Sequence, residues 1–304
     1  MQALRCATTL FALALVSVLG TGISHAQATR TWVSGVGDDA NPCSRTAPCK
    51  TFAGAISKTA AAGEINCLDS GGFGAVTITK SITIDCTGVL AGVLVSGTNG
   101  IIVTDSGANS IAVTLRNLDI NGLGTGLNGI SFLSGRSLRI EHVTIYGFQA
   151  GSASGISMTA GSGARLSVND VTITDCANGV FANPISGNNI SDIKNVRIWN
   201  ITNGISAQGA AIMSVRESNI SMSTVGVLES GVVGGQVTVS VSQFTSNGTA
   251  VKANVGSYVA AFGNVFFQNG TVFNTNGGAI YTDAKNVLAG NGIAGAPNAT
   301  VTIL

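Results

Sequence analysis

Residues 166–180 read LSVNDVTITDCANGV, and this stretch decides the fold. Apolar residues at positions 166, 168, 171 and 173 alternate with polar ones, and the pair Asn169-Asp170 interrupts the alternation. Such alternation is typical of a strand with one buried face. The stretch therefore predicts two short strands joined by a polar corner, followed by a turn at Asn178-Gly179 in which glycine supplies a positive φ.

The same pattern recurs along the chain at intervals of about two dozen residues. With Ile173 as the reference, equivalent apolar positions follow one another after 25, 28, 25, 22, 24, 23 and 21 residues. These reference positions are Ile120, Ile145, Ile173, Ile198, Ile220, Phe244, Phe267 and Leu288. A repeat of this length, made of strands and turns without a helix, predicts a solenoid in which each turn of chain stacks on the one before.

A corner residue stands three positions before each reference residue. The corner residues are Asn117, His142, Asp170, Asn195, Glu217, Val241, Asn264 and Lys285. Most of these side chains are of the types that bond to nearby backbone at a turn. Because neighbouring strands lie about 4.8 Å apart, we also expect successive corner side chains to bond to one another.

This repeat, with its Asn-type corner, resembles that of the right-handed parallel β-helices, the pectin-lyase-like superfamily, over roughly residues 76–288. Residues 33–84 contain DDANPCS, APCKTFAGAI and GEINCLDSGGFGAVTITKSITI, which resemble the opening of secreted bacterial β-helix proteins of unassigned activity. The predicted fold class is all-β: a single-stranded right-handed parallel β-helix with a short N-terminal capping α-helix. Because this fold hosts lyases, hydrolases, tailspikes and adhesins, it does not imply one reaction.

Three segments are predicted. Residues 1–26 have the positive start, apolar middle and small-x-small end (Ser24-His25-Ala26) of a signal peptide, which indicates a secreted or periplasmic protein. Residues 27–75 hold a first strand, a loop and a capping helix over residues 51–62, and residues 76–304 form the β-helix with a last strand at 300–304. Past the leader, no apolar run reaches the roughly 18 residues of a transmembrane helix.

Charged residues make up only 10% of the chain and the net charge is +1, which argues against nucleic acid as a partner. In an oxidising compartment, disulfides are expected. Cys43 and Cys49 share a loop, and Cys67 and Cys86 lie near neighbouring strands, so these two pairs are favoured, although spacing alone leaves other connectivities open. Cys176 is then left over, and we expect a buried, unreactive thiol.

Two groups of polar residues are candidates for chemistry. Asp38, Asp39 and Asn41 offer oxygen ligands for calcium, with a capping loop as the alternative, and no other cofactor is expected. A charged stripe on the outer face before the corner contains Glu141 and Asp192, which are either members of an ion-pair ladder or an acid and a base.

In the second reading, Arg139 or Lys194 would hold an acidic sugar. His142, the one histidine after the leader, is expected to hydrogen-bond at the corner rather than to catalyse. The polygalacturonase signatures and the Arg-x-Pro-x-x-Arg run of pectate lyases are missing. Whether the protein is an enzyme therefore stays open, with the sequence favouring a non-catalytic role.

Two outer faces remain for binding. After the corner, Tyr146 and Trp199 occupy equivalent positions two repeats apart, about 9.6 Å from the strand spacing, with Arg197 beside them. Exposed rings at this separation predict a platform for successive sugars; the alternative is that a loop covers them or that they are isolated surface aromatics. The other face follows each Asn-Gly turn and presents Ser131, Ser157, Phe181, Ser206, Leu228, Lys252 and Phe273.

In pectate lyases and polygalacturonases, the resemblance implies, the active cleft lies along or beside this second face, yet here it carries one lysine and no carboxylate. We therefore expect an exported protein that binds a polysaccharide along an outer face. A divergent polysaccharide lyase or glycoside hydrolase and a structural or adhesive surface protein remain alternatives. The sequence leaves the oligomeric state open, whether monomer or oligomer.

Overall fold

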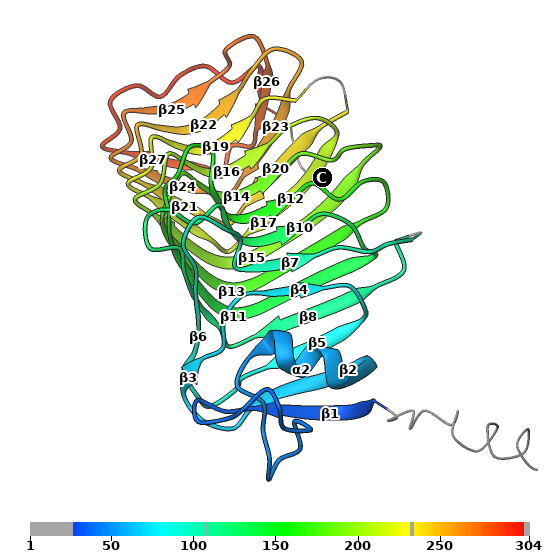
Figure 1. The fold of residues 1–304 in the computed structure, drawn as a ribbon. Helices are drawn as coiled ribbons and strands as arrows, with labels where there is room; N and C mark the ends of the chain where they lie inside the picture. The colour runs from blue at the N-terminus through cyan, green and yellow to red at the C-terminus, as the bar shows by residue number, and fades with distance from the viewer. Residues whose placement is uncertain (1–26, 108, 232–233, 301–304) are drawn as a thin grey trace, which may run out of the picture.

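The structure, a computed structural model, describes residues 27–107, 109–231 and 234–300. The predicted signal peptide at 1–26 and all but the first residue of the predicted last strand at 300–304 lie outside this range. Within it, almost every element is a strand that pairs in parallel with its equivalent one turn of chain later (Figure 1). The predicted parallel β-helix is confirmed.

One sheet has nine strands. They are β4 (Val76–Ile78), β7 (Ile101–Val103), β10 (Asn128–Phe132), β12 (Ser154–Met158), β14 (Asn178–Ala182), β16 (Asn203–Ala207), β19 (Val225–Glu229), β22 (Thr249–Ala253) and β25 (Thr271–Asn274).

The second sheet has nineteen strands and bends at a corner. Strands on the near side of the corner are β1 (Ala28–Val33), β2 (Thr59–Cys67), β5 (Ile82–Asp85), β8 (Ala112–Arg116), β17 (Ala211–Arg216), β20 (Gln236–Ser240), β23 (Tyr258–Phe262), β26 (Ala279–Thr282) and β28 (Ala299–Thr300). Strands beyond it are β3 (Gly71–Gly72), β6 (Ala91–Leu94), β9 (Asp119–Asn121), β18 (Asn219–Ser221), β21 (Gln243–Thr245), β24 (Val265–Phe267) and β27 (Val287–Ala289). Three long strands run through it: β11 (Ser137–Phe148), β13 (Arg165–Cys176) and β15 (Asn189–Trp199).

Strand register confirms that the reference residues stack. Ile145 pairs with Ile173 and Ile173 with Ile198, and all three side chains are fully buried. The complete column is Val93, Ile120, Ile145, Ile173, Ile198, Ile220, Phe244, Phe266 and Leu288. Each buried side chain of this size contributes about 1.5–3 kcal/mol to folding, so such columns dominate stability.

The predicted reference residue Phe267 is wrong by one position. Phe266 pairs with Phe244 and is buried, whereas Phe267 is 43% exposed. Two adjacent phenylalanines make the alternation ambiguous, and the turn of chain here is one residue shorter than counted. The same shift places Phe273, predicted to face outward, against Val251 in the interior.

At the first corner, between the two halves of the second sheet, the chain turns through a single left-handed residue. Asn117, His142, Asp170, Asn195, Glu217 and Val241 have φ values of 56°, 55°, 53°, 52°, 52° and 49°. These are the predicted corner residues. The next turn uses Gly263, with a φ of 60°, so Asn264 is not a corner residue and lies buried instead.

Each post-corner strand lies between two corners. At both corners, the inward side chains are apolar in the lower turns and become Ser and then Asn in the upper turns. At the first corner, Val171 and Val196 give way to Ser218, Ser242, Asn264 and Asn286. At the second corner, which follows the post-corner strands, Phe148, Cys176 and Ile201 give way to Ser223, Asn247, Asn269 and Asn291. Each Asn Oδ1 in these ladders accepts the backbone N–H of the residue one turn earlier, at 2.8–3.0 Å.

The capping helix is shorter than predicted. α2 spans Phe52–Lys58 instead of residues 51–62, because Thr59 leaves the helix for β2, which pairs with both β1 and β5. Sheet pairing thus overrides the helix propensity of the alanines at 60–62. Thr51 caps the N-terminus by accepting from the Gly54 N–H, and Phe52 packs on Phe73 with ring centroids 5.2 Å apart.

Both favoured disulfides are confirmed. Cys43 is bonded to Cys49 and Cys67 to Cys86, with Cα atoms 4.6 and 4.7 Å apart. Cys176 is free and buried, as expected, and burial raises the pKa of its thiol to about 12. A thiol that holds its proton so tightly is a poor nucleophile.

One carboxyl group lies inside the solenoid. Glu229 occupies the inward position held by Ala207 one turn below and Ala253 one turn above, and it is fully buried. Its Oε1 accepts the Gly231 N–H at 3.0 Å, while Oε2 has no hydrogen-bond partner among the described residues. Burial raises the pKa of Glu229, and the hydrogen bond from Gly231 opposes this only in part.

Truncation of a column residue should be costly. Ile173→Ala leaves a cavity between Ile145 and Ile198, and we expect a loss of about 2–5 kcal/mol in the free energy of unfolding. Thr172→Ala, on the outer face of the same strand, should change it by less than about 0.5 kcal/mol. Urea unfolding followed by circular dichroism measures both, and equal losses would contradict the inside-outside assignment.

Stability should depend on pH through Glu229. Because its pKa is raised in the folded state, the folded protein binds the proton more tightly, and stability falls as pH rises from the ordinary glutamate range to the folded pKa. Glu229→Gln removes this loss, so the variant should unfold at higher urea than wild type at pH 8 and at nearly the same urea at pH 4. Glu217→Gln, at an exposed carboxyl, is the control. A Glu229→Gln difference that is the same at both pH values would refute the assignment.

Candidate functional site

The predicted corner residues bond to one another. His142 Nδ1 lies 2.8 Å from Asp170 Oδ2, and Asn195 donates to Asp170 Oδ1 at 3.3 Å. Asn117 donates to the hydroxyl of Thr87 one turn earlier at 2.6 Å. His142 therefore takes part in the corner ladder, although its side chain remains more than half exposed.

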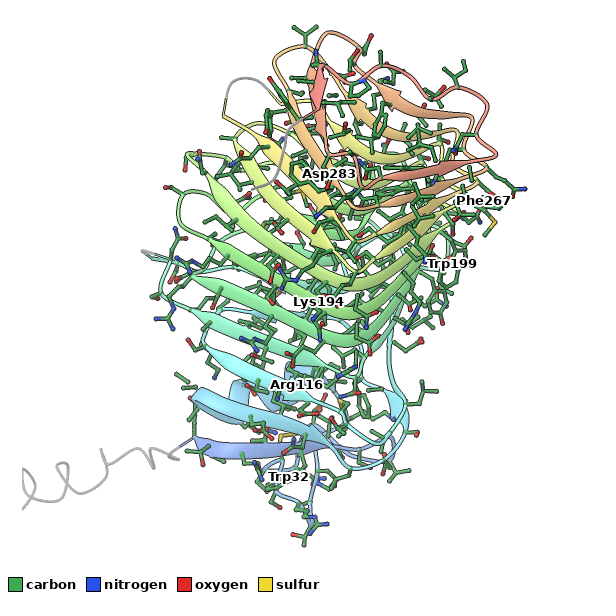
Figure 2. All side chains as sticks on the ribbon, turned by 180° about the vertical axis from the view of Figure 1, so that it is seen from behind. Trp32, Arg116, Lys194, Trp199, Phe267 and Asp283 are labelled. Carbon is green, nitrogen blue, oxygen red and sulfur yellow. A yellow bond between two sulfur atoms is a disulfide. The ribbon has the colours of Figure 1, made fainter. Side chains whose placement is uncertain are left out.

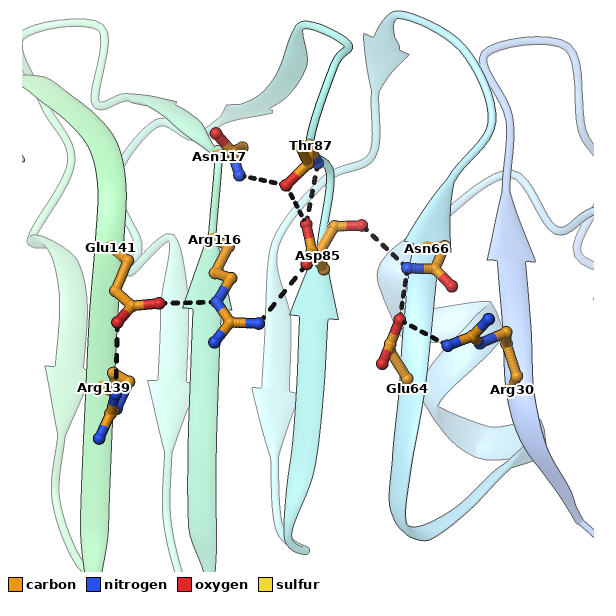
Figure 3. A network of polar contacts seen from close by, with 9 residues as sticks. All are labelled: Arg30, Glu64, Asn66, Asp85, Thr87, Arg116, Asn117, Arg139 and Glu141. Carbon is orange, nitrogen blue, oxygen red and sulfur yellow. Dashed lines mark hydrogen bonds and ion pairs between the residues drawn. The ribbon is translucent and has the colours of Figure 1, made fainter.

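The outer charge stripe is a chain of ion pairs (Figure 3). Arg116 Nε donates to Glu141 Oε2 at 2.6 Å and its Nη1 lies 3.6 Å from Asp85, while Arg139 contacts Glu141 Oε1 at 3.4 Å. The hydrogen bond from Arg116 holds the pKa of Glu141 below its usual range. Glu141 is therefore kept ionised, which does not suit a general acid.

In the next turns along the axis of the solenoid, the charged side chains of the same outer face also form ion pairs. Arg216 holds Asp192 through two hydrogen bonds of 2.6 and 2.8 Å, and Lys194 lies 3.3 Å from Glu217. Figure 2 looks onto this face, where Arg116 and Lys194 follow the axis of the solenoid. Within the described part of the chain, no three His, Cys, Asp or Glu side chains gather so as to hold a metal ion.

The Asp38 and Asp39 carboxylates proposed for calcium have other partners. Asp39 Oδ1 accepts the N–H groups of Lys50 and Thr51 at 2.8 and 2.9 Å, and these bonds contribute to lowering the pKa of Asp39 against the effect of its burial. The ammonium of Lys58 donates to the carbonyl oxygens of Asp39 and Asn41. Asp38 caps a turn through the Ala40 N–H at 2.9 Å. A lysine thus supplies the positive charge of this loop.

Tyr146 and Trp199 lie in one outer column, two turns apart, as the spacing indicated. Tyr146 pairs with Thr174, and Thr174 with Trp199. The Tyr146 hydroxyl donates to Asp119 Oδ1 at 3.0 Å, and burial together with this bond raises the pKa of Tyr146. Arg197 lies next to Trp199 on the strand but its Nη1 is 3.5 Å from Asp170 Oδ1.

Sequence reasoning missed a third aromatic residue of this column. Phe267 follows three turns beyond Trp199, through Ser221 and Thr245. Figure 2 shows Trp199 and Phe267 along the same edge of the molecule. Correct placement of Phe266 inside the solenoid would have revealed its neighbour on the outside.

The nine-stranded sheet carries a hollow on its outer face, here called the outer groove. It has a volume of about 420 Å³ and adjoins a second hollow of about 400 Å³ at the second corner, with which it shares Gly151, Ala177 and Thr202. The outer groove is lined by Gly151, Ser152, Ala177, Asn178, Phe181, Thr202, Asn203, Ser206, Gln208 and Leu228.

Stacked small and large side chains form this groove. Phe181, Ser206 and Leu228 are successive members of one outer column, so the serine forms the floor between two larger walls. Ser206 is only 2% exposed, and its hydroxyl has no hydrogen-bond partner among the described residues. The hydroxyl itself is not among the fully buried side-chain atoms that lack a partner, so it is accessible from the groove for a ligand's hydrogen bond.

Amide side chains border the floor. Asn203 Nδ2 donates to Asn178 Oδ1 at 3.0 Å, and Asn178 Nδ2 donates to the Ser152 carbonyl at 3.1 Å. In the described range, the side-chain amide of Gln208 makes no hydrogen bond, while its backbone N–H donates to the Ala182 carbonyl. None of the lining side chains is charged. The groove therefore offers an aromatic ring, a hydroxyl and amides to a neutral ligand.

Glycine is needed at the start of these strands because the backbone of the next turn lies very close, and not because of a positive φ as predicted. Gly179 and Gly204 both lack a positive φ. A Cβ on Gly179 would lie 2.4 Å from the Gly204 carbonyl oxygen, which is closer than any side chain tolerates. The Asn-Gly pairs thus combine a bonding amide with the one residue that fits between stacked turns.

Comparisons with known proteins define the fold. No protein-family model and no curated protein matches the sequence. Among solved structures, pectate lyase Pel9A matches with a TM-score of 0.66 at 14% identity, over 92% of this chain and 80% of its own. XylC in complex with xylose matches with 0.64 at 12% identity, over 85% and 69%. Pectin methylesterase in complex with a hexasaccharide matches with 0.51 at 11% identity, over 92% and 94%. The chain thus has the parallel β-solenoid fold seen in pectate lyase and pectin methylesterase.

Proposed function

We propose that this protein binds a polysaccharide along its outer wall and that the outer groove is the main contact site. The unpaired hydroxyl of Ser206 on the groove floor is the observation that carries the proposal. Sugar hydroxyls are both donors and acceptors, so they satisfy this serine and the amides of Asn203 and Gln208. Phe181 supplies the apolar wall on which the C–H face of a sugar ring packs.

The solved structures of similar fold support a carbohydrate as the ligand. Their names include a pectate lyase, a lacto-N-biosidase from Eubacterium ramulus and a pectin methylesterase bound to a hexasaccharide. At 11–14% identity they share the fold, and their activities are their own. The groove of this chain, lined by uncharged groups, fits a neutral sugar better than a uronate.

Tyr146, Arg197 and Trp199 form a second, weaker contact in this proposal. Trp199 is half-buried and its ring remains available to a sugar, while Arg197 is more than half exposed. The Tyr146 hydroxyl is held toward Asp119, which fixes its ring. A hollow of about 300 Å³ is lined in part by Arg197, but neither Tyr146 nor Trp199 lines it, so we rank these three residues below the groove.

Binding without catalysis is favoured over a lyase or hydrolase. Glu141 and Asp192, the candidate acid and base, are each held by arginines, and His142 by Asp170. Catalytic carboxylates instead need one group whose pKa is raised and that faces the substrate. Nothing in the geometry of the described residues favours a structural or adhesive function over the binding of a glycan.

We also propose that the protein is secreted or periplasmic. Two disulfides are formed, and such bonds persist in oxidising compartments. In the described part of the chain, no helix is both long and apolar enough to cross a bilayer.

Changes in the outer groove should weaken binding. Phe181→Ala removes the wall and Ser206→Leu fills the floor, and each should raise the Kd at least tenfold, about 1.4 kcal/mol. Calorimetric titration with xylo- and galacto-oligosaccharides, and with oligogalacturonates for comparison, measures this. Leu94→Ala, on an exposed side chain outside the groove, is the control. If both groove variants bind like wild type, the groove is not the site.

The aromatic pair needs its own test. Tyr146→Ala combined with Trp199→Ala should weaken binding of long oligosaccharides by a few-fold and leave short ones unaffected, because only a long chain reaches beyond the groove. Tyr146→Phe keeps the ring and should bind like wild type. Unchanged binding of long chains by the double variant would eliminate the platform.

A further inference from the structure

The outer face before the first corner changes composition along the axis. From β5 to β17 it carries the ion pairs described above. From β20 onward the outward positions are Gln236, Thr238, Ser240, Tyr258, Ala260, Phe262, Ala279 and Tyr281. The charged Asp283, which follows β26, is buried and accepts the N–H groups of Gly263 and Lys285 at 3.1 and 3.3 Å. The upper part of this face, here called the tyrosine face, is thus uncharged.

Two tyrosine rings pack together at its centre. Tyr258 and Tyr281 lie on adjacent strands with ring centroids 5.0 Å apart and planes tilted by 31°. In the register, Tyr258 stands opposite Ala279 and Tyr281 opposite Ala260, so each ring has a small neighbour. Ala260 is only 3% exposed although it points outward, because the rings crowd around it. The pair forms a joined apolar surface flanked by Phe262.

Polar groups beside the rings are free to bind. Within the described residues, neither tyrosine hydroxyl makes a hydrogen bond, and the side chains of Gln236 and Thr238 on the next strand also have no partner. Tyr258 is 37% exposed. Aromatic surface, free hydroxyls and a free amide without charge are the same set of groups that the outer groove presents.

The tyrosine face and the outer groove lie on different walls. The face belongs to the nineteen-stranded sheet and the groove to the nine-stranded one, and the two sheets turn their inner sides toward a shared core. Their outer sides therefore point in different directions. The tyrosine face lies before the first corner, and the post-corner strands that carry Tyr146 and Trp199 separate it from the groove. A stiff sugar chain that extends from the groove past the second corner would have to bend around the first corner as well to reach the tyrosine face.

We propose that the tyrosine face is a second binding site for neutral polysaccharide, so that one protein molecule bridges two sugar chains. This inference rests on the proposed function and extends it from binding to cross-linking. Two sites on one rigid body raise the apparent affinity for a network of chains without any new contact.

The test compares site number with cross-linking. Titration of the full chain with a neutral xylo- or galacto-oligosaccharide should give two sites, and mixing with the long xylan or galactan should raise light scattering. Tyr258→Ala combined with Tyr281→Ala should leave one site and reduce the scattering at least tenfold. Tyr258→Phe with Tyr281→Phe keeps the rings and should retain most of the scattering, and Leu90→Ala is a control at an exposed apolar side chain outside both sites.

The two proposals fail in different ways. If the double alanine variant keeps both sites and full scattering, or if Phe181→Ala alone abolishes all binding, the tyrosine face is not a site and the groove stands. If the double alanine variant abolishes all binding and Phe181→Ala does nothing, the groove is wrong and bridging fails with it. If the wild type binds none of these neutral sugars, both are overturned.

Discussion

Parallel register between successive turns is the constraint on which the structure depends. A residue that stacks on its equivalent in the next turn must share its environment, so one inward position defines a whole buried column, as with Ile145, Ile173 and Ile198. The same rule aligns outward residues. Ion pairs, aromatic columns and the groove all arise because side chains of different turns are held about 4.8 Å apart on one wall.

Charge pairing on the outer wall limits what the protein can recognise. The outward carboxylates before the corner meet arginine or lysine on a neighbouring turn, as Glu141 meets Arg116 and Asp192 meets Arg216. Exposed pairs of this kind add little stability, but they neutralise the face. The outer groove and the tyrosine face present hydroxyls, amides and rings without charge, and these are the groups on which the proposed binding of neutral sugars rests.

The repeat period, the first six of the eight corner residues and both disulfides could be predicted from the sequence because each depends on local pattern or nearness in the chain. The errors have physical causes. Adjacent Phe266 and Phe267 fit either face, and only pairing with Phe244 decides between them. The alanines after Lys58 favour a helix, but the residues on either side of them, Thr59 and 63–67, pair with β1 and β5 and so end the helix.

The outer groove could not be predicted, because it depends on how far each side chain rises above the sheet relative to its neighbours. The sequence places Phe181, Ser206 and Leu228 on one face, yet it does not show that the serine lies below its neighbours or that its hydroxyl is unpaired. Glu229 was missed for a similar reason: a carboxylate at the end of a strand reads as solvated unless the register with Ala207 and Ala253 is known.

The asparagine ladders of the upper turns fix the number of residues between equivalent positions of successive turns. Asn264 to Asn286 and Asn247 to Asn269 are each 22 residues apart, whereas Phe148 and Cys176 lower down are separated by 28. Apolar contacts tolerate slippage, but an amide that must meet one backbone N–H does not. Insertions during evolution should therefore accumulate in the loops of the lower turns, leaving the upper turns uniform in length.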